Sequence, residues 1–252
     1  MLLHNKVSLI TGAGAGIGAA VARRFADDGA TLWLNDIDAD ALAAVVADTG
    51  GGGRAGDASD PEFVATWVDE AVRRHGRVDV LYSNVGVSRS GRIGDLTDDD
   101  WRLQQRLTLD TCFYATRAVI PHMLTGGGGS IVAMSSGAGI GGQFGLGGYA
   151  AAKAGVISLM ETVATEYGDE GIRANSVTPG PTATAPLLDH LERQEGGVAA
   201  HTADLDLARL TEPDEVAAVV AWLASDESSG ITGMCIRANI RSASRRQRRA
   251  RP

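Results

Sequence analysis

Residues 7–18 read Val-Ser-Leu-Ile-Thr-Gly-Ala-Gly-Ala-Gly-Ile-Gly, and a stretch rich in alanine and valine follows them. The apolar run at 7–10 predicts a buried strand, and the pattern at 17–28 predicts a helix. Between them, the glycines permit a sharp turn and a close approach to a pyrophosphate, whose charge the free amides at the helix start attract. A glycine-rich turn standing alone would more simply be a structural turn. The candidate phosphate-loop residues are Gly12, Ala15, Gly16, Ile17 and Gly18.

The rest of the chain repeats this alternation of an apolar run and a helical pattern. Further strands are predicted at 30–34, in a short run ending near 56, and at 78–82, 130–134, 173–177 and 234–237. Further helices are predicted at 39–48, 61–75, 98–124, 150–167 and 214–223. Such alternation is typical of parallel strands covered by helices on both faces. The sequence therefore predicts an α/β, doubly wound Rossmann fold, in which residues 1–240 form a single domain with a mostly parallel central sheet flanked by helices.

Composition and charge exclude a disordered chain and a specific nucleic-acid partner. Hydrophobic residues make up 44% of the 252 residues and charged residues 21%, which is typical of a globular protein. The first 240 residues carry 17 basic and 31 acidic side chains, whereas residues 241–252 hold six arginines and no acid. An acidic body argues against a nucleic-acid groove. We interpret the arginine-rich tail as a solvated, disordered end, with a polyanion-binding arm or a reading-frame change near residue 237 as alternatives.

Membrane and metal partners are not expected. No apolar run approaches the roughly 20 residues that span a bilayer, and the first residues lack a signal-peptide pattern. Cys112 and Cys235 are too few for a disulfide framework and lack the paired spacing of a zinc site. We therefore expect a cytoplasmic protein that binds no metal.

An acid follows the second predicted strand. Asp36 lies 24 residues after Gly12, at the carboxyl end of that strand. Its carboxylate can accept hydrogen bonds from the ribose hydroxyls of a dinucleotide, and it would repel a 2′-phosphate. Neither Ala15 nor Ile37 supplies a compensating positive charge. The sequence therefore predicts NAD(H) rather than NADP(H), with helix capping by Asp36 as the alternative interpretation.

A second motif, Tyr149-Ala-Ala-Ala-Lys153, lies at the head of a predicted helix, so its tyrosine and lysine project from the same face. A neighbouring ammonium and an oxidised nicotinamide both favour the phenolate, which lowers a tyrosine pKa toward neutral pH. Ser136 follows a predicted strand thirteen residues earlier, where its hydroxyl can orient a reacting oxygen. The tyrosine and lysine alone would be a chance helical pair. Together with the glycine loop, the three residues indicate hydride transfer to or from a carbonyl or secondary alcohol.

These motifs, in this order, resemble those of the short-chain dehydrogenase/reductase family over residues 5–236. The resemblance implies that Tyr149 exchanges a proton with the substrate oxygen, that Ser136 steadies this oxygen, and that Lys153 lowers the tyrosine pKa and holds the cofactor ribose. It also implies that Asp57 binds adenine. Beyond the phosphate loop, the predicted cofactor-binding residues are Asp36, Ile37, Asp57, Ala58, Asn84, Val85, Gly86, Tyr149, Lys153, Pro179, Gly180, Thr182 and Thr184.

The resemblance also implies an assembly and a lid. Members of the family pair the helices that correspond to 98–124 and 150–167, which implies a homo-oligomer, either a tetramer or a dimer. The segment after Thr184 is the lid that selects the substrate in such proteins. Residues 185–210 are interpreted as this lid, with an ordinary surface excursion as the alternative. Apolar residues in this segment and in 137–148 predict a largely apolar pocket for a small-molecule alcohol or ketone.

One departure from the family pattern bears on catalysis. The position of the fourth catalytic residue, an asparagine in the family, is occupied by Thr108, counting back from Pro121. A threonine hydroxyl offers fewer hydrogen-bonding groups than a carboxamide. We therefore expect a slower proton relay in this chain.

The sequence thus predicts an NAD-dependent oxidoreductase acting on the CH–OH group of a secondary alcohol, or on the corresponding ketone. A 3-oxoacyl thioester reductase of the same family is one alternative, which Asp36 disfavours because that activity more naturally uses NADPH. A non-catalytic dinucleotide-binding sensor or scaffold is the other. The presence of Ser136, Tyr149 and Lys153 speaks against it.

Overall fold

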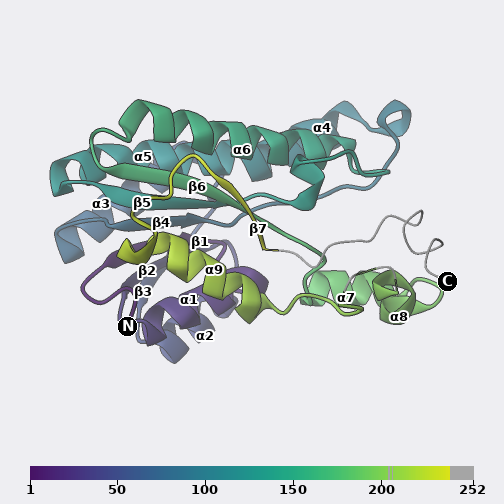
Figure 1. Cartoon of the computed structure of the whole chain (residues 1–252), viewed down its shortest axis with the longest axis horizontal. Helices are drawn as coiled ribbons and strands as arrows, with labels where there is room; N and C mark the ends of the chain where they lie inside the picture. Colours follow the sequence, from purple (N-terminus) through teal and green to yellow (C-terminus); the bar gives the residue numbers. More distant parts are fainter. Residues whose placement is uncertain (204, 206, 239–252) are drawn as a thin grey trace.

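The computed structural model describes residues 1–203, 205 and 207–238. Within these residues, seven parallel strands form one sheet in the order β3-β2-β1-β4-β5-β6-β7 (Figure 1). The strands are β1 (Val7–Thr11), β2 (Thr31–Asp36), β3 (Gly52–Ala55), β4 (Val80–Ser83), β5 (Gly129–Met134), β6 (Ile172–Pro179) and β7 (Cys235–Ala238). The α-helices are α1 (Gly16–Asp27), α2 (Ala39–Thr49), α3 (Pro61–His75), α4 (Asp98–Gln105), α5 (Thr111–Gly126), α6 (Gly147–Tyr167), α7 (Ala185–Glu192), α8 (Gly197–Thr202) and α9 (Pro213–Ala224). Short 3-10 turns are η1 (Ile93–Asp95), η3 (Gly137–Gly139) and η4 (Asp226–Ser228). The predicted doubly wound fold with a parallel sheet is confirmed.

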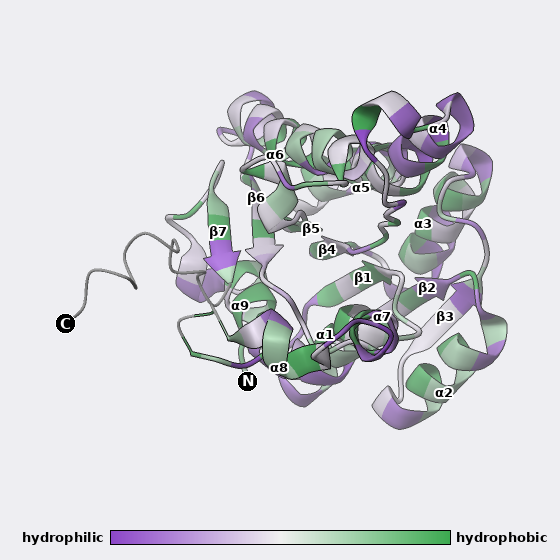
Figure 2. Ribbon diagram, turned by 90° about the vertical axis from the view of Figure 1, so that its right-hand side faces the viewer, coloured by the Kyte–Doolittle hydropathy of each residue, from purple (hydrophilic) through white to green (hydrophobic). Residues whose placement is uncertain are grey.

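Two apolar cores lie on opposite faces of the sheet. Successive side chains of a strand point to opposite faces, so Leu9 and Ile10 of β1 belong to different cores. Ile10 packs in the core that includes Phe25 of α1 and Val220 of α9, whereas Leu9 packs in the core that includes Trp67 of α3. Helices α1, α2 and α9 therefore cover one face, and α3, α5 and α6 cover the other (Figures 1 and 2).

The boundaries of α2 and α3 follow from local sequence. Asp38 caps α2 by accepting hydrogen bonds from the amides of Asp40 and Ala41, and Asp60 caps α3 in the same way. Side-chain oxygens at this position satisfy amides that have no partner within the helix. Because Asp38 supplies this cap, Asp36 at the end of β2 is not the capping residue of α2.

The predicted helix at 98–124 is interrupted. Helix α4 ends at Gln105, a π-helical segment η2 (Arg106–Asp110) follows, and α5 begins at Thr111. Single π turns inside helices are frequent at functional sites, and this one contains Thr108. In the weakly periodic segment 185–210 the structure has two short helices, α7 and α8. The arginine-rich tail, 241–252, lies outside the described residues.

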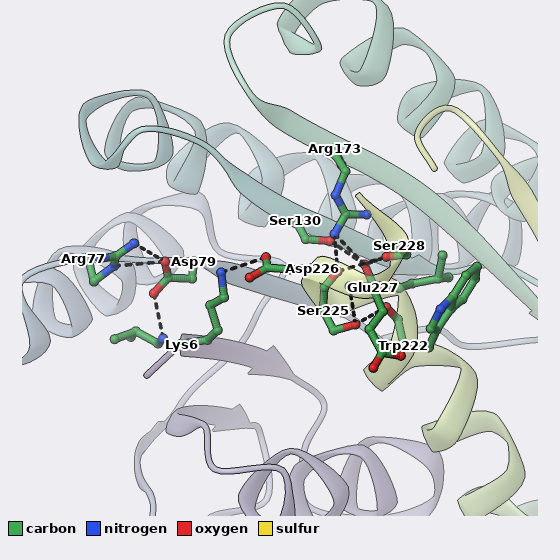
Figure 3. Close-up of polar contacts among 12 residues, drawn as sticks. Lys6, Arg77, Asp79, Ser130, Arg173, Trp222, Ser225, Asp226, Glu227 and Ser228 are labelled. Carbon is green, nitrogen blue, oxygen red and sulfur yellow. Dashed lines mark hydrogen bonds and ion pairs between the residues drawn. The ribbon is translucent and has the colours of Figure 1, made fainter. Parts of the chain in front are cut away.

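Polar contacts fix α9 to the amino ends of the strands (Figure 3). The guanidinium of Arg173, near the start of β6, donates to the carbonyl oxygens of Leu223 at 3.0 Å and Ser225 at 2.9 Å. The Ser130 hydroxyl of β5 donates to the same Leu223 oxygen at 2.9 Å. These bonds satisfy carbonyls at the carboxyl end of α9 that have no partner within the helix. The network lies at the opposite end of the strands from the site described next.

Candidate active site

A cleft opens where the chain reverses direction across the sheet, at the carboxyl ends of β1 and β4. In doubly wound sheets, ligands bind at this point because neighbouring loops leave in opposite directions. The cavity has a volume of about 300 Å³. Its lining contains seven of the predicted cofactor residues besides Gly12, together with four that were not predicted. The lining residues are Gly12, Asn35, Asp36, Ile37, Gly56, Asp57, Ala58, Asn84, Val85, Gly86, Val87 and Leu107.

The glycine loop takes the conformation that its sequence predicts. Gly12 and Gly16 have φ of +64° and +53°, a region that favours glycine. A Cβ atom at Gly12 would lie 3.1 Å from the amide nitrogen of Asn84, and one at Gly18 would overlap the Gly12 carbonyl oxygen. Ala15, the residue before α1, offers no side chain to cap the first turn of this helix. The loop thus presents backbone amides to the cleft with no side chain in the way.

The carboxylate of Asp36 is oriented by two backbone amides. It accepts hydrogen bonds from Gly14 at 2.7 Å and from Asp38 at 3.0 Å. Ile37, next in the chain, is 74% exposed at the rim of the cleft. The carboxylate therefore lies between the glycine loop and the start of α2. A ligand that binds between these two segments contacts its negative charge.

Asn84 fastens the end of β4 to the glycine loop. Its amide nitrogen donates to the Gly12 carbonyl at 2.9 Å, and its backbone amide donates to the Thr11 hydroxyl at 3.2 Å. Tyr82 donates to the Asn84 side-chain oxygen at 3.1 Å. Asn84 therefore sets the shape of the cleft as well as lining it. The contributions of Thr11 and Tyr82 were not predicted, because both residues lie at or near the ends of strands whose apolar pattern indicates a structural role.

The structure brings Ser136, Tyr149 and Lys153 together. Ser136 follows β5 and caps the short turn η3, while Tyr149 and Lys153 lie in the first turns of α6. Burial raises the pKa of Tyr149 above its ordinary value, and a hydrogen bond with Ser136 lowers it in part. The lysine was expected to lower this pKa. In the protein alone, burial dominates instead, because a phenolate loses more by leaving water than the serine offsets.

Lys153 is almost fully buried, with 2% of its surface exposed. Its ammonium donates to the Met134 carbonyl at 2.6 Å and lies 5.7 Å from the centre of the Tyr149 ring. Burial lowers the pKa of Lys153 to about 8. The ammonium also touches the cleft wall, because a Cβ atom at Gly86 would lie 2.9 Å from it.

Thr108 lies on the same side of the cleft as the lysine. Its side chain is 1% exposed, and its hydroxyl accepts a hydrogen bond from the Val87 amide at 3.3 Å. A Cβ atom at Gly86 would lie 3.7 Å from this hydroxyl. Thr108 thus supports the segment after β4, beside Lys153, from within the π-helical turn.

The predicted residues after β6 divide into two groups. Pro179 ends this strand, with its carbonyl oxygen 4.0 Å from where a Cβ atom of Gly137 would lie, and Gly180 follows it. Thr184 packs against the glycine loop, where a Cβ atom at Gly16 would lie 3.2 Å from its methyl group. Thr182 is different. Its side chain is 6% exposed and donates to the Gly180 carbonyl at 3.0 Å, so its hydroxyl is directed to the backbone.

The described part of the chain offers neither a membrane span nor a metal cluster. No helix there is long and apolar enough to cross a membrane. The same residues contain no group of three or more His, Cys, Asp or Glu side chains that could hold a metal ion.

Known proteins match both the sequence and the fold. A family model described as enoyl-(acyl carrier protein) reductase matches residues 12–239. The 3-oxoacyl-[acyl-carrier-protein] reductase FabG of Thermotoga maritima is 38% identical over 94% of this chain and 97% of its own length. The cyclohexanol dehydrogenase of Acinetobacter sp. strain SE19 is 39% identical over 91% of this chain and 92% of its own.

A solved structure titled 7α-hydroxysteroid dehydrogenase, in complex with NADH and 7-oxo glycochenodeoxycholic acid, has a TM-score of 0.87 to this chain. It is 30% identical, and the match covers 93% of each chain. The chain belongs to the short-chain dehydrogenase/reductase family. It is accordingly an oxidoreductase that acts on CH–OH groups or the corresponding carbonyls, and its family binds a nicotinamide dinucleotide.

Proposed function

We propose that this protein is an NAD-dependent dehydrogenase/reductase of secondary alcohols and ketones. One observation carries the proposal: the triad of Ser136, Tyr149 and Lys153 stands beside a cleft whose other end holds the carboxylate of Asp36. The residues present fit a dinucleotide. The glycine loop leaves room where any side chain would collide with Asn84, and the carboxylate suits free ribose hydroxyls.

The triad supplies acid–base chemistry. During oxidation the Tyr149 phenolate removes the hydroxyl proton of the alcohol, and during reduction the phenol returns a proton to the carbonyl oxygen. Ser136 donates a hydrogen bond to this oxygen and Lys153 holds the cofactor ribose. A nicotinamide bound in the cleft would supply the hydride chemistry, as acceptor in oxidation and as donor in reduction. Thr108 and the buried ammonium of Lys153 form the start of the path by which the proton reaches solvent.

The segment 185–210 serves as the substrate lid. It leaves and rejoins the fold at adjacent points, because Ala183 donates to the Thr211 carbonyl at 2.8 Å and Thr211 donates to the Pro181 carbonyl at 2.9 Å. Helices α7 and α8 lie between these points, beyond the carboxyl end of β6 (Figure 1). A small apolar alcohol or ketone is the proposed substrate.

A homo-oligomer, tetrameric or dimeric, is also proposed, with the outer faces of α5 and α6 as its interface. A groove of about 280 Å³ lies between these helices, lined by residues that include Phe113, Ile120 and Leu159. Phe113 is 41% exposed, and burial of such a ring favours association. Sedimentation of the purified protein tests this, and a monomer at micromolar concentration would refute it. Free cysteines at 112 and 235 suit the cytoplasm that we propose as its location.

A panel of secondary alcohols and ketones, with NAD(H) and NADP(H) compared, tests the activity by absorbance of the reduced cofactor. Cyclohexanol and 2,3-butanediol belong in the panel because relatives are named for them. Tyr149→Phe should abolish turnover and leave NADH binding intact, whereas Tyr114→Phe, on the neighbouring helix α5, should leave both unchanged. NADH binding without turnover of any substrate would favour the sensor instead.

The 3-oxoacyl thioester reductase remains a second candidate, because FabG of Thermotoga maritima is a relative over nearly the whole chain. A 3-oxoacyl thioester in the same panel separates the two. Efficient reduction of this thioester with NADPH, together with no turnover of simple ketones, would favour it.

A further inference from the structure

Arg106 connects the catalytic side of the cleft to the loop after β3. It opens the π-helical segment η2, 47 residues away in sequence from the side chain that it contacts. Its guanidinium donates a hydrogen bond to the Ser59 hydroxyl at 2.8 Å and lies 3.7 Å from an oxygen of Asp57. No part of the proposed reaction uses this contact.

The two oxygens of the Asp57 carboxylate have different surroundings. Oδ1 accepts hydrogen bonds from the Ser59 amide at 2.8 Å and the Ser59 hydroxyl at 2.7 Å. Oδ2 faces the guanidinium of Arg106 at a distance longer than a hydrogen bond, and no other described residue donates to it. Since Asp57 lines the cleft, Oδ2 is the oxygen left to accept a hydrogen bond from a ligand.

Arg106, Leu107 and Thr108 are consecutive, and each serves the cleft in a different way. Arg106 holds the Asp57 loop, Leu107 lines the cavity, and Thr108 supports the segment after β4 through Val87. The π-helical turn thus joins both walls of the cleft. The rotation per residue differs between an α-helical and a π-helical turn. An α-helical turn here would therefore direct these three side chains elsewhere than the π-helical turn does.

We propose that Arg106 is a positioning residue for the adenine end of the dinucleotide. Through Ser59, it fixes the Asp57 carboxylate so that Oδ2 accepts a hydrogen bond from the adenine amino group. The inference rests on the proposed dinucleotide cofactor. Nothing in the sequence singled out Arg106, and the proposal makes the preference for adenine depend on the π-helical segment that also carries Thr108.

The contribution of Arg106 comes from orientation more than from charge. Its side chain is 52% exposed and that of Asp57 is 42% exposed, so solvent screens their attraction. The hydrogen bond to Ser59 is shorter and directional. Without it, the Ser59 hydroxyl can rotate away from Asp57, so that the carboxylate keeps only the Ser59 amide as a donor and can turn about this single bond.

Binding of two reduced cofactors tests the proposal. They are NADH and its hypoxanthine analogue, in which a carbonyl oxygen replaces the adenine amino group. Both affinities are measured by cofactor fluorescence, without substrate. The wild type should favour NADH, because Asp57 accepts a hydrogen bond from an amino group and repels a carbonyl oxygen. In Arg106→Ala, NADH binding should weaken by about fivefold to tenfold and the preference for NADH over the analogue should largely disappear.

Arg102→Ala is the matched control. Arg102 lies one turn earlier, its side chain is 70% exposed, and within the described residues this side chain forms ion pairs with Asp98 and Asp99. This variant removes the same charge and should bind both cofactors as the wild type does. Ser59→Ala provides a second test that keeps the charge, and it should reproduce the loss of preference. Circular dichroism confirms that each variant is folded.

Three results would overturn the proposal. Arg106→Ala could bind NADH as tightly as Arg102→Ala does, it could lose affinity for NADH and the analogue by the same factor, or the wild type could show no preference between them. Failure of the proposed function looks different. If Arg106→Ala loses the preference that the wild type shows, but the wild type turns over no alcohol or ketone, the proposed reaction is refuted and the role of Arg106 is supported.

Discussion

Replacement of Asp36 by alanine should change the cofactor preference. The carboxylate is held by the amides of Gly14 and Asp38, and in the proposed complex it accepts hydrogen bonds from the adenosine ribose. Asp36 is half-buried, so each ribose bond contributes about 0.7 kcal/mol after solvent screening, below the range for fully buried charged groups. Loss of both should lower kcat/KM for NAD by about tenfold.

The same change removes a repulsion. A carboxylate and a 2′-phosphate about 4 Å apart repel by about 2 kcal/mol at an effective dielectric constant of about 40. Its removal should raise kcat/KM for NADP by about 30-fold, so that the ratio of the two specificity constants changes by about 300-fold in total. Asp36→Asn, which removes the charge and keeps the shape, should show most of the gain with NADP and less of the loss with NAD.

Steady-state kinetics with one good alcohol and both cofactors measures this ratio. Asp38→Ala is the control, because it removes a neighbouring carboxylate that caps α2. Loss of this cap should cost about 1 kcal/mol of stability and leave the cofactor ratio unchanged. A change of less than about threefold in Asp36→Ala, or an equal change in Asp38→Ala, would refute the electrostatic reasoning.

Three further predictions concern Thr108, Lys153 and Arg173. Thr108→Asn should raise kcat by up to about tenfold by restoring a fuller proton relay, and an unchanged or lower rate would contradict this. The pKa of Lys153 is about 8 in the fold and 10.5 in the unfolded chain. Between these two pH values the unfolded chain therefore holds more protons than the folded protein, so the free energy of unfolding should rise with pH. In Lys153→Met this rise should be less steep. Urea unfolding at several pH values measures both. Arg173→Ala should lower the free energy of unfolding by about 1–3 kcal/mol, since it removes the charged donor from the carbonyls of Leu223 and Ser225, which keep hydroxyl donors from Ser130 and Ser228. The kcat of the folded protein should stay unchanged.

Local sequence predicted most of the fold. The strand at 7–10 was recognisable because consecutive apolar residues mark a strand buried on both faces, and the structure confirms it as β1. The capping acids Asp38 and Asp60 mark the starts of α2 and α3. β3, in contrast, reads Gly-Gly-Arg-Ala, so only its position before Gly56 indicated a strand.

The features that sequence did not predict depend on contacts between distant segments. Nothing in residues 98–124 distinguishes a continuous α-helix from one with a π turn, and the contact of this turn with the segment after β4, from the Val87 amide to the Thr108 hydroxyl, joins residues 21 positions apart. Arg106 resembles any surface arginine until the fold brings Ser59 to it. The family pattern pointed to position 108, two residues further on, and this was the one signal that could have directed attention to Arg106.

The closed stem of the lid has a consequence for engineering. Because 181–183 and Thr211 are bonded to each other, the segment between them begins and ends at nearly the same place. A loop closed in this way can be lengthened at small entropic cost, since doubling its length adds only about 0.6 kcal/mol. The segment between these two points should therefore be exchangeable. Replacing it with the corresponding segment of a relative should preserve the fold and transfer the substrate preference of that relative.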